Sequence, residues 1–294
     1  MKNFLQRLIF TISLIAVAVS ADLAGGQTPE SLVGQSRTFV ISEDVRLHSR
    51  IYGDGPVVVL LPGRGGSGIE QFAELGKIIA KEGYTAVLID PRGVGESVGP
   101  LESLTLHDLA SDIAFVIEEF DKGPAIVIGR AFGNRIARCV AADHPELVQA
   151  VVLVAAGGLV PMSEDVRADF VRLFSSEKLS EEERLELIHR TLYASDSDPR
   201  LQLRLTSYDA AGKAQTEASQ ATPLDDWWAA GQAPGLIVQG LEDRIAVPEN
   251  GYLLKQKLGD RAKLVNIPKA GHSLYLEKPV EVANAILEYL RMIN

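Results

Sequence analysis

The chain has 294 residues, of which 46% are apolar and 23% charged, so it contains ample material for a globular core. Its formal net charge of −10 argues against nucleic acids and anionic membrane surfaces as partners. Cys139 is the only cysteine, which excludes an internal disulfide, and its apolar neighbours predict a buried thiol.

The N-terminus has the pattern of a secretory signal. Lys2 and Arg7 precede an apolar run at residues 8–19, and small residues suited to cleavage follow it. The run is short for a membrane span, and an uncleaved anchor is the alternative interpretation. We expect a signal peptide at residues 1–21, a flexible leader at 22–37, and a periplasmic or secreted mature protein without stable membrane association.

Strand and helix patterns alternate along the first half of the chain. Two short alternating runs within residues 36–53 predict a hairpin. Continuous apolar runs, typical of strands buried on both faces, occur at residues 56–63, 84–93, 124–129 and 148–158. Apolar residues recur at helical spacing in residues 69–83, 106–120 and 134–146. This alternation predicts a mostly parallel sheet flanked by helices.

A segment without strand patterns interrupts the alternation. The pattern of residues 160–228 predicts helices rich in charged residues, and we expect them to form a cap inserted into a single α/β domain. Two further strand patterns, at 234–240 and 262–268, follow the segment and precede a final helix. The predicted α/β core therefore comprises residues 38–159 and 229–294.

The glycine-rich stretch GRGGSG at residues 63–68 permits two interpretations. It fits G-x-G-x-x-G between a strand and a helix, and Asp90 ends the next strand near the place of a ribose-binding acid. A dinucleotide-binding oxidoreductase is therefore one hypothesis. The preceding hairpin and Pro62 count against it, and such a loop alone is a weak signal.

Several motifs together carry a resemblance to the α/β-hydrolase superfamily that covers residues 38–292. LLPGRGGSG resembles the oxyanion loop after the third strand, and DPRGVGES resembles the turn after the fourth. GRAFG at 129–133 occupies the nucleophile elbow, and GLEDRIAVP and AGHSLYLEKP resemble the acid and histidine turns. Their order along the chain is the one that this fold requires. The resemblance implies an α/β-hydrolase fold with a helical cap and a small-molecule ligand, and it implies no cofactor.

The resemblance also assigns roles to individual residues. His272 is the expected base, and Asp243 is the carboxylate that orients it. The backbone N–H groups of Arg64 and Phe132 form the expected oxyanion hole. Ala131 stands at the nucleophile position and offers no nucleophilic atom. Because backbone donors do not depend on side chains, the oxyanion hole can persist without the nucleophile.

Three hypotheses explain the alanine at the elbow. The first is an engineered change from serine, and the second is an inactive homologue that binds a small ligand. The third is an enzyme in which His272 and Asp243 act as a dyad on water or on the substrate, without a covalent intermediate. The retained dyad favours the third hypothesis, a hydrolase or lyase of a small activated ester, lactone or diketone.

Other side chains are candidates for ligand binding. Arg130 and Arg64 flank the expected pocket and suit a carboxylate or enolate if they point inward, whereas the alternative is that they pair with acids. Trp227 and Trp228 end the predicted cap, and we expect one to line the pocket and the other to pack. No histidine pair shows metal-ligand spacing together with a carboxylate partner, so no metal is predicted. Ser67 and Ser273 lack an elbow, and turn or capping roles are expected for both.

Overall fold

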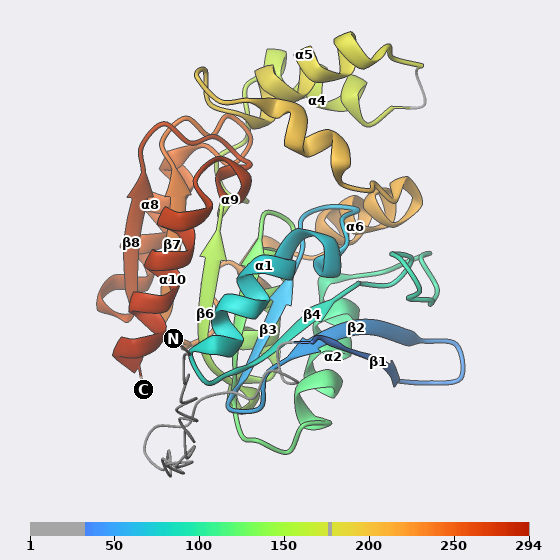
Figure 1. Cartoon of the computed structure of the whole chain (residues 1–294), viewed down its shortest axis with the longest axis vertical. Coiled ribbons are helices and arrows are strands. Elements are labelled where there is room, and N and C mark those ends of the chain that lie inside the picture. The colour runs from blue at the N-terminus through green and yellow to red at the C-terminus, as the bar shows by residue number, and fades with distance from the viewer. Residues whose placement is uncertain (1–32, 176–177, 294) are drawn as a thin grey trace, which may run out of the picture.

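Eight strands form one mixed sheet in the order β1-β2-β4-β3-β5-β6-β7-β8 (Figure 1). The structure, a computed structural model, describes residues 33–175 and 178–293. The strands are β1 (Gln35–Val40), β2 (Arg46–Tyr52), β3 (Val57–Leu61), β4 (Thr85–Ile89), β5 (Ala125–Arg130), β6 (Val148–Val154), β7 (Gly235–Gly240) and β8 (Ala262–Ile267). Strand β2 pairs antiparallel with β1 and β4, whereas the remaining neighbours are parallel. The predicted hairpin and the predicted mostly parallel sheet are both confirmed.

The start of the sheet corrects one predicted boundary. Residues 35–37, which we expected in the flexible leader, belong to β1 because they pair with β2. The predicted signal peptide at residues 1–21 lies outside the described residues. No helix within 33–175 and 178–293 combines the length and the apolar character that a membrane crossing requires.

Helices cover both faces of the sheet. On one face lie α1 (Gly68–Lys81) and α10 (Pro279–Ile293), and on the other lie α2 (Leu106–Glu118), α3 (Gly133–Asp143) and α8 (Pro248–Leu258). Each face therefore has its own apolar core, and the central strands β3 to β7 are buried from both sides.

Strand β3 shows why the sequence pattern of the central strands is continuous rather than alternating. Val58 and Leu60 belong to the core beneath α1 and α10. Val57, Val59 and Leu61 belong to the core on the opposite face. All five side chains are buried, so every position of the strand is selected for apolar character.

A helical cap lies between β6 and β7, beyond the carboxyl ends of the parallel strands (Figure 1). Its helices are α4 (Glu164–Leu173), α5 (Glu181–Leu192), the short η3 (Pro199–Arg204), α6 (Asp209–Ala221) and α7 (Leu224–Trp227). The described part of this insertion contains no strand. Helices α4 and α5 share a small apolar core, distinct from those of the sheet, formed by Leu173, Leu187, Ile188, Leu192 and Tyr193. Buried apolar residues of α6 and α7 belong instead to the core under α2 and α3.

Candidate active site

The elbow connects β5 to α3 through a tight turn centred on Ala131. Its φ of 49° lies in the left-handed region, where residues with a β-carbon are strained. Ala131 N donates a hydrogen bond of 2.9 Å to Val154 O, which anchors the turn to the neighbouring strand. A β-carbon on Gly133 would lie 2.6 Å from Pro62 O, so the elbow packs directly on the backbone that leads into the loop after β3. The backbone geometry of a nucleophile elbow is therefore present with alanine at its apex.

His272 and Asp243 form a buried hydrogen-bonded pair. His272 Nδ1 lies 2.9 Å from Asp243 Oδ2 and 3.1 Å from Oδ1. The side chain of Asp243 is fully buried, and its Oδ1 accepts hydrogen bonds from the backbone N–H groups of Ile245 (2.9 Å) and Ala246 (2.8 Å). These donors fix the carboxylate, which in turn fixes the imidazole ring. Among the described residues His272 Nε2 has no hydrogen-bond partner, and the residue lines the cavity described below.

Two glutamine side chains shape the loop between β3 and α1. Gly63 N donates to Gln71 Oε1 at 3.2 Å, and Gly65 N donates to Gln215 Oε1 of the cap at 2.7 Å. The N–H of Arg64 lies between these two and, within the described part of the chain, donates to no acceptor. The N–H of Phe132 at the start of α3 is equally without an acceptor there. Both predicted oxyanion donors are thus available beside the elbow.

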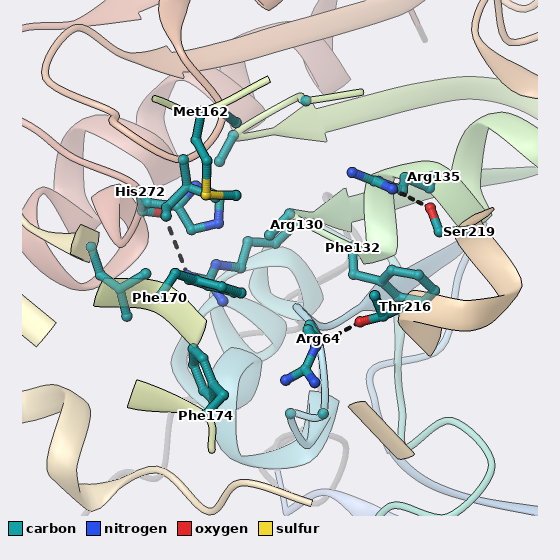
Figure 2. Close-up of a pocket in the computed structure, with 18 of the residues that line it drawn as sticks. Arg64, Arg130, Phe132, Arg135, Met162, Phe170, Phe174, Thr216, Ser219 and His272 are labelled. Atoms are coloured by element: carbon teal, nitrogen blue, oxygen red, sulfur yellow. Dashed lines mark hydrogen bonds between the residues drawn. The ribbon is translucent and has the colours of Figure 1, made fainter. Parts of the chain in front are cut away.

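A cavity of about 550 Å³ brings the predicted residues together (Figure 2). Arg64, Arg130, Ala131, Phe132 and His272 all line it from the side of the sheet. The cap contributes apolar side chains to the lining, among them Met162, Phe170 and Phe174. The volume is within the usual range for a small-molecule site.

Arg130 and Arg64 both reach the cavity. Arg130 is 6% exposed, and its Nη2 lies at the long distances of 3.4 Å from His272 O and 3.5 Å from Ser273 Oγ. Arg64 donates from Nε to Thr216 Oγ1 at 2.9 Å. Neither guanidinium has a carboxylate within 4.0 Å among the described residues, so the alternative that both pair with acids is wrong.

Arg135 is a lining residue that sequence reasoning missed. It lies in the first turn of α3, and its guanidinium donates to Ser219 Oγ of α6 (Figure 2). Burial lowers the pKa of Arg135 below its usual value. The available signal was its position in the first turn of the helix that follows the elbow.

The expectation that one tryptophan lines the pocket is wrong. Trp227 and Trp228 are 2% and 6% exposed, and neither lies in the lining of the cavity. Their rings lie 4.6 and 4.7 Å from the guanidinium carbon of Arg138, which is fully buried in α3. Both tryptophans therefore pack against the helix that follows the elbow, and they also confine Gly158.

The dinucleotide-binding interpretation of residues 63–68 is also wrong. Asp90 is 3% exposed and accepts hydrogen bonds from Ser67 Oγ at 2.7 Å and from Ile69 N at 3.3 Å. Ser67 in turn caps α1 by accepting from Glu70 N. The cap covers the loop, since Tyr208 N donates to Gly65 O at 2.8 Å. The acid and the glycines that would hold a nucleotide are thus engaged within the protein.

A second cluster of potential ligand atoms lies outside the cavity. The side chains of His107, Cys139 and Asp143 approach within 4.8 Å of one another between α2 and α3. His107 Nδ1 lies 2.7 Å from Asp143 Oδ2, and Cys139 Sγ donates to the same carboxylate at 3.4 Å. Burial and this carboxylate raise the pKa of the Cys139 thiol. The three side chains are thus linked to one another between α2 and α3.

The chain belongs to the α/β-hydrolase family, since the family model described as alpha/beta hydrolase fold matches residues 56–279. It is 25% identical to BpoC of Mycobacterium tuberculosis, a protein named for non-heme bromoperoxidase activity, over 82% of this chain and 96% of that protein. The crystal structure of BpoC has the same fold, with a TM-score of 0.73, 23% identity and coverage of 88% and 99% of the two chains.

Another relative is named as a hydrolase of an organic acid. The chain is 26% identical to the 2-hydroxy-6-oxo-6-(2'-aminophenyl)hexa-2,4-dienoic acid hydrolase of Metapseudomonas resinovorans, over 81% of this chain and 85% of that enzyme. The similar proteins thus bear enzyme names, and membership of a hydrolase family is the coarse functional statement that they support.

Proposed function

We propose that the protein is a hydrolase or lyase of small activated carbonyl compounds that works through a His272–Asp243 dyad without an acyl-enzyme. The observation that carries this proposal is the buried hydrogen bond between His272 Nδ1 and Asp243 at a cavity whose elbow holds Ala131. A protein that only binds a ligand does not need an imidazole oriented by a carboxylate beside two free oxyanion donors. A base-driven enzyme requires all of these groups.

His272 is the group that moves the proton in this proposal. Asp243 accepts the Nδ1–H hydrogen bond, so the basic lone pair resides on Nε2, and the carboxylate stabilises the imidazolium that forms. Because Ala131 offers only a methyl group, the attacking atom comes from water or from the substrate itself. Nε2 takes a proton from that water, or from an acidic C–H of a diketone.

The hydrolytic reaction then has two steps. The water oxygen bonds to the carbonyl carbon, its proton passes to His272, and the N–H groups of Arg64 and Phe132 hold the negative oxygen. The intermediate next expels its leaving group, which takes the proton back from the imidazolium. General-base catalysis of this kind contributes about 10²–10⁴-fold, so we expect turnover of activated rather than ordinary esters.

The relatives support a carbonyl substrate. The enzyme of Metapseudomonas resinovorans is named for a substrate that contains an oxo group and a carboxylic acid. The same chemistry suits the dyad and oxyanion donors of this chain, since an oxo group becomes an oxyanion on attack.

A substrate screen tests the proposed function. Lactones, β-diketones and short activated esters are offered to the wild-type protein and to the variants His272→Ala and Asp243→Asn. We expect turnover that falls by about 10²-fold or more in either variant, because the base is removed or misoriented. His189→Ala is the matched control, since His189 lies in α5 and does not line the cavity. Ligand binding without turnover in any of the proteins contradicts the proposal and favours a binding protein.

A further inference from the structure

The cavity has a charge opposite to that of the whole protein. The chain carries a net charge of −10, yet four arginines line the cavity, namely Arg64, Arg130, Arg135 and Arg167. No aspartate or glutamate among the described residues contributes to the lining. A concave site with one sign of charge and apolar walls concentrates ligands of the opposite sign.

The arginine nearest the reaction site is buried without a counter-ion. Arg130 directly precedes Ala131 and extends toward His272 and Phe170 in Figure 2. Its Nε is buried and has no hydrogen-bond partner, and its two Nη2 contacts are 3.4 and 3.5 Å long. The ring of Tyr275, 4.5 Å from the guanidinium carbon, compensates part of the charge. Burial of a cation in this way is costly unless an anion joins it.

Two more guanidinium groups face the same space from other elements. Arg64 comes from the loop after β3 and has a buried Nη1 without a partner, and Arg135 comes from α3. Burial lowers the pKa of Arg64, an effect that the more distant Asp209 partly opposes. Figure 2 shows the two side chains on the far side of Arg130 from His272, near Thr216 and Ser219 of the cap.

Arg138 shows what a purely structural buried arginine looks like in this protein. Its Nη2 donates to Asn134 Oδ1 at 2.5 Å and to Gly157 O at 2.6 Å, and it lies against both tryptophans. It does not line the cavity. Both arginines have one buried nitrogen without a partner, Nη1 in Arg138 and Nε in Arg130. Arg130, however, has neither the short hydrogen bonds nor the double aromatic contact of Arg138, and it lines the cavity.

We propose that the cavity binds small organic carboxylates, with Arg130 holding the carboxylate next to the reacting carbonyl group and the apolar cap holding the rest of the molecule. A planar guanidinium donates to a carboxylate through two parallel hydrogen bonds, which also fixes orientation. Phe170 and Phe174, whose rings lie 4.8 Å apart, add apolar surface from the cap, and the Phe174 ring lies 5.2 Å from the guanidinium carbon of Arg64. The inferred substrate is an oxo acid or carboxylated ester with an apolar body. This inference rests on the proposed function only for the identity of the reacting group.

Equilibrium binding tests the inference independently of turnover. Benzoylpropionate, its primary amide and inorganic phosphate are titrated into wild-type protein and into Arg130→Gln, with heat of binding as the readout. We expect wild-type protein to bind the carboxylate saturably at millimolar or lower concentration and to bind the amide about ten-fold to hundred-fold more weakly. In Arg130→Gln the affinity for the carboxylate should fall by the same factor. His272→Ala retains binding, so a failure of the proposed catalysis remains distinguishable.

Two further variants distinguish a loss of binding caused by the missing charge from one caused by misfolding. Arg64→Gln alters a half-buried residue and should weaken carboxylate binding even if Arg130→Gln folds poorly. Arg200→Gln removes an exposed arginine outside the cavity and should leave binding unchanged. Equal affinity for the amide and the carboxylate, phosphate binding without carboxylate binding, or the absence of any saturable carboxylate binding would each overturn the inference.

Discussion

Ala131 determines which chemistry is open to the elbow without altering its backbone. Its left-handed φ of 49° costs about 1–2 kcal/mol for a residue with a β-carbon. The strain is imposed by the surroundings, because Ala131 N is tied to Val154 O and Gly133 packs against the backbone of Pro62. A serine at this position would therefore present its hydroxyl from the same backbone.

Restoring the hydroxyl tests whether the rest of the elbow is intact. We expect Ala131→Ser to gain weak esterase activity on small activated esters and to react with a fluorophosphonate probe at position 131, because His272 can activate the new nucleophile. The wild-type protein should stay unlabelled. The double variant Ala131→Ser with His272→Ala is the control and should also resist the probe. Labelling of the wild-type protein at Ser67 or Ser273 would contradict our assignment of the site.

Asp90 gives the stability a specific dependence on pH. Burial raises the pKa of Asp90 above its ordinary value of 3.8, and the hydrogen bonds from Ser67 and Ile69 only partly oppose this. The folded protein thus binds the proton more tightly than the unfolded chain. The contribution of Asp90 to stability therefore increases as the pH falls through the folded pKa, and it is complete below the unfolded value.

Comparison with an amide measures this contribution. We expect the free energy of unfolding of the wild type, relative to that of Asp90→Asn, to rise as the pH is lowered from neutral to about pH 4. Urea denaturation of both proteins across this range provides the measurement. A difference that stays constant with pH would mean that burial does not perturb this carboxyl group.

At the scale of elements, the sheet was predictable because its signal is local. The five buried residues of β3 are all apolar, and the turns that follow β5, β7 and β8 carry motifs of fixed spacing. The residues that line the cavity were harder to predict from the sequence, because the lining depends on how the cap packs on the sheet. The position of Arg135 at the cavity and the packing of Trp227 and Trp228 on α3, away from the cavity, follow from contacts between α3, α6 and α7. No local pattern encodes such contacts between distant segments.

The close approach of α3 to β3 predicts a strong effect of a single methyl group. Gly133→Ala would place a β-carbon 2.6 Å from Pro62 O and against the Leu61 carbonyl group, so the helix must move. We expect a loss of about 3 kcal/mol or more in the free energy of unfolding. Gly123→Ala is the comparison, since nothing lies within 4 Å of the added atom and only its φ of 78° is unfavourable. The free energy of unfolding of that variant should fall by about 1 kcal/mol, and urea denaturation of both variants measures the difference.

The molecule as a whole combines two large cores on the sheet with a small one in the cap. The sheet cores enclose nearly all of β3 to β7, whereas the core shared by α4 and α5 contains five buried side chains. A core of that size contributes little stability by itself, and the cap also depends on contacts such as Gly65 N to Gln215 Oε1. The arginine-lined cavity lies at this boundary, so the arrangement of its lining depends on how the cap packs on the sheet.

Two matched leucine variants test whether the cap unfolds separately. Leu187→Ala removes a buried side chain from the cap core, and Leu109→Ala removes one from the core beneath α2 and α3. Each change lowers the free energy of unfolding of the part of the protein that contains it by about 2–5 kcal/mol. The two tryptophans pack on α3, so their fluorescence reports the sheet and its helices. We expect Leu109→Ala to lower the fluorescence midpoint in urea, whereas Leu187→Ala should lower it less and should accelerate amide hydrogen exchange in α4 and α5. If both variants shifted the midpoint equally and neither accelerated exchange in the cap selectively, the cap and the sheet would form a single cooperative unit.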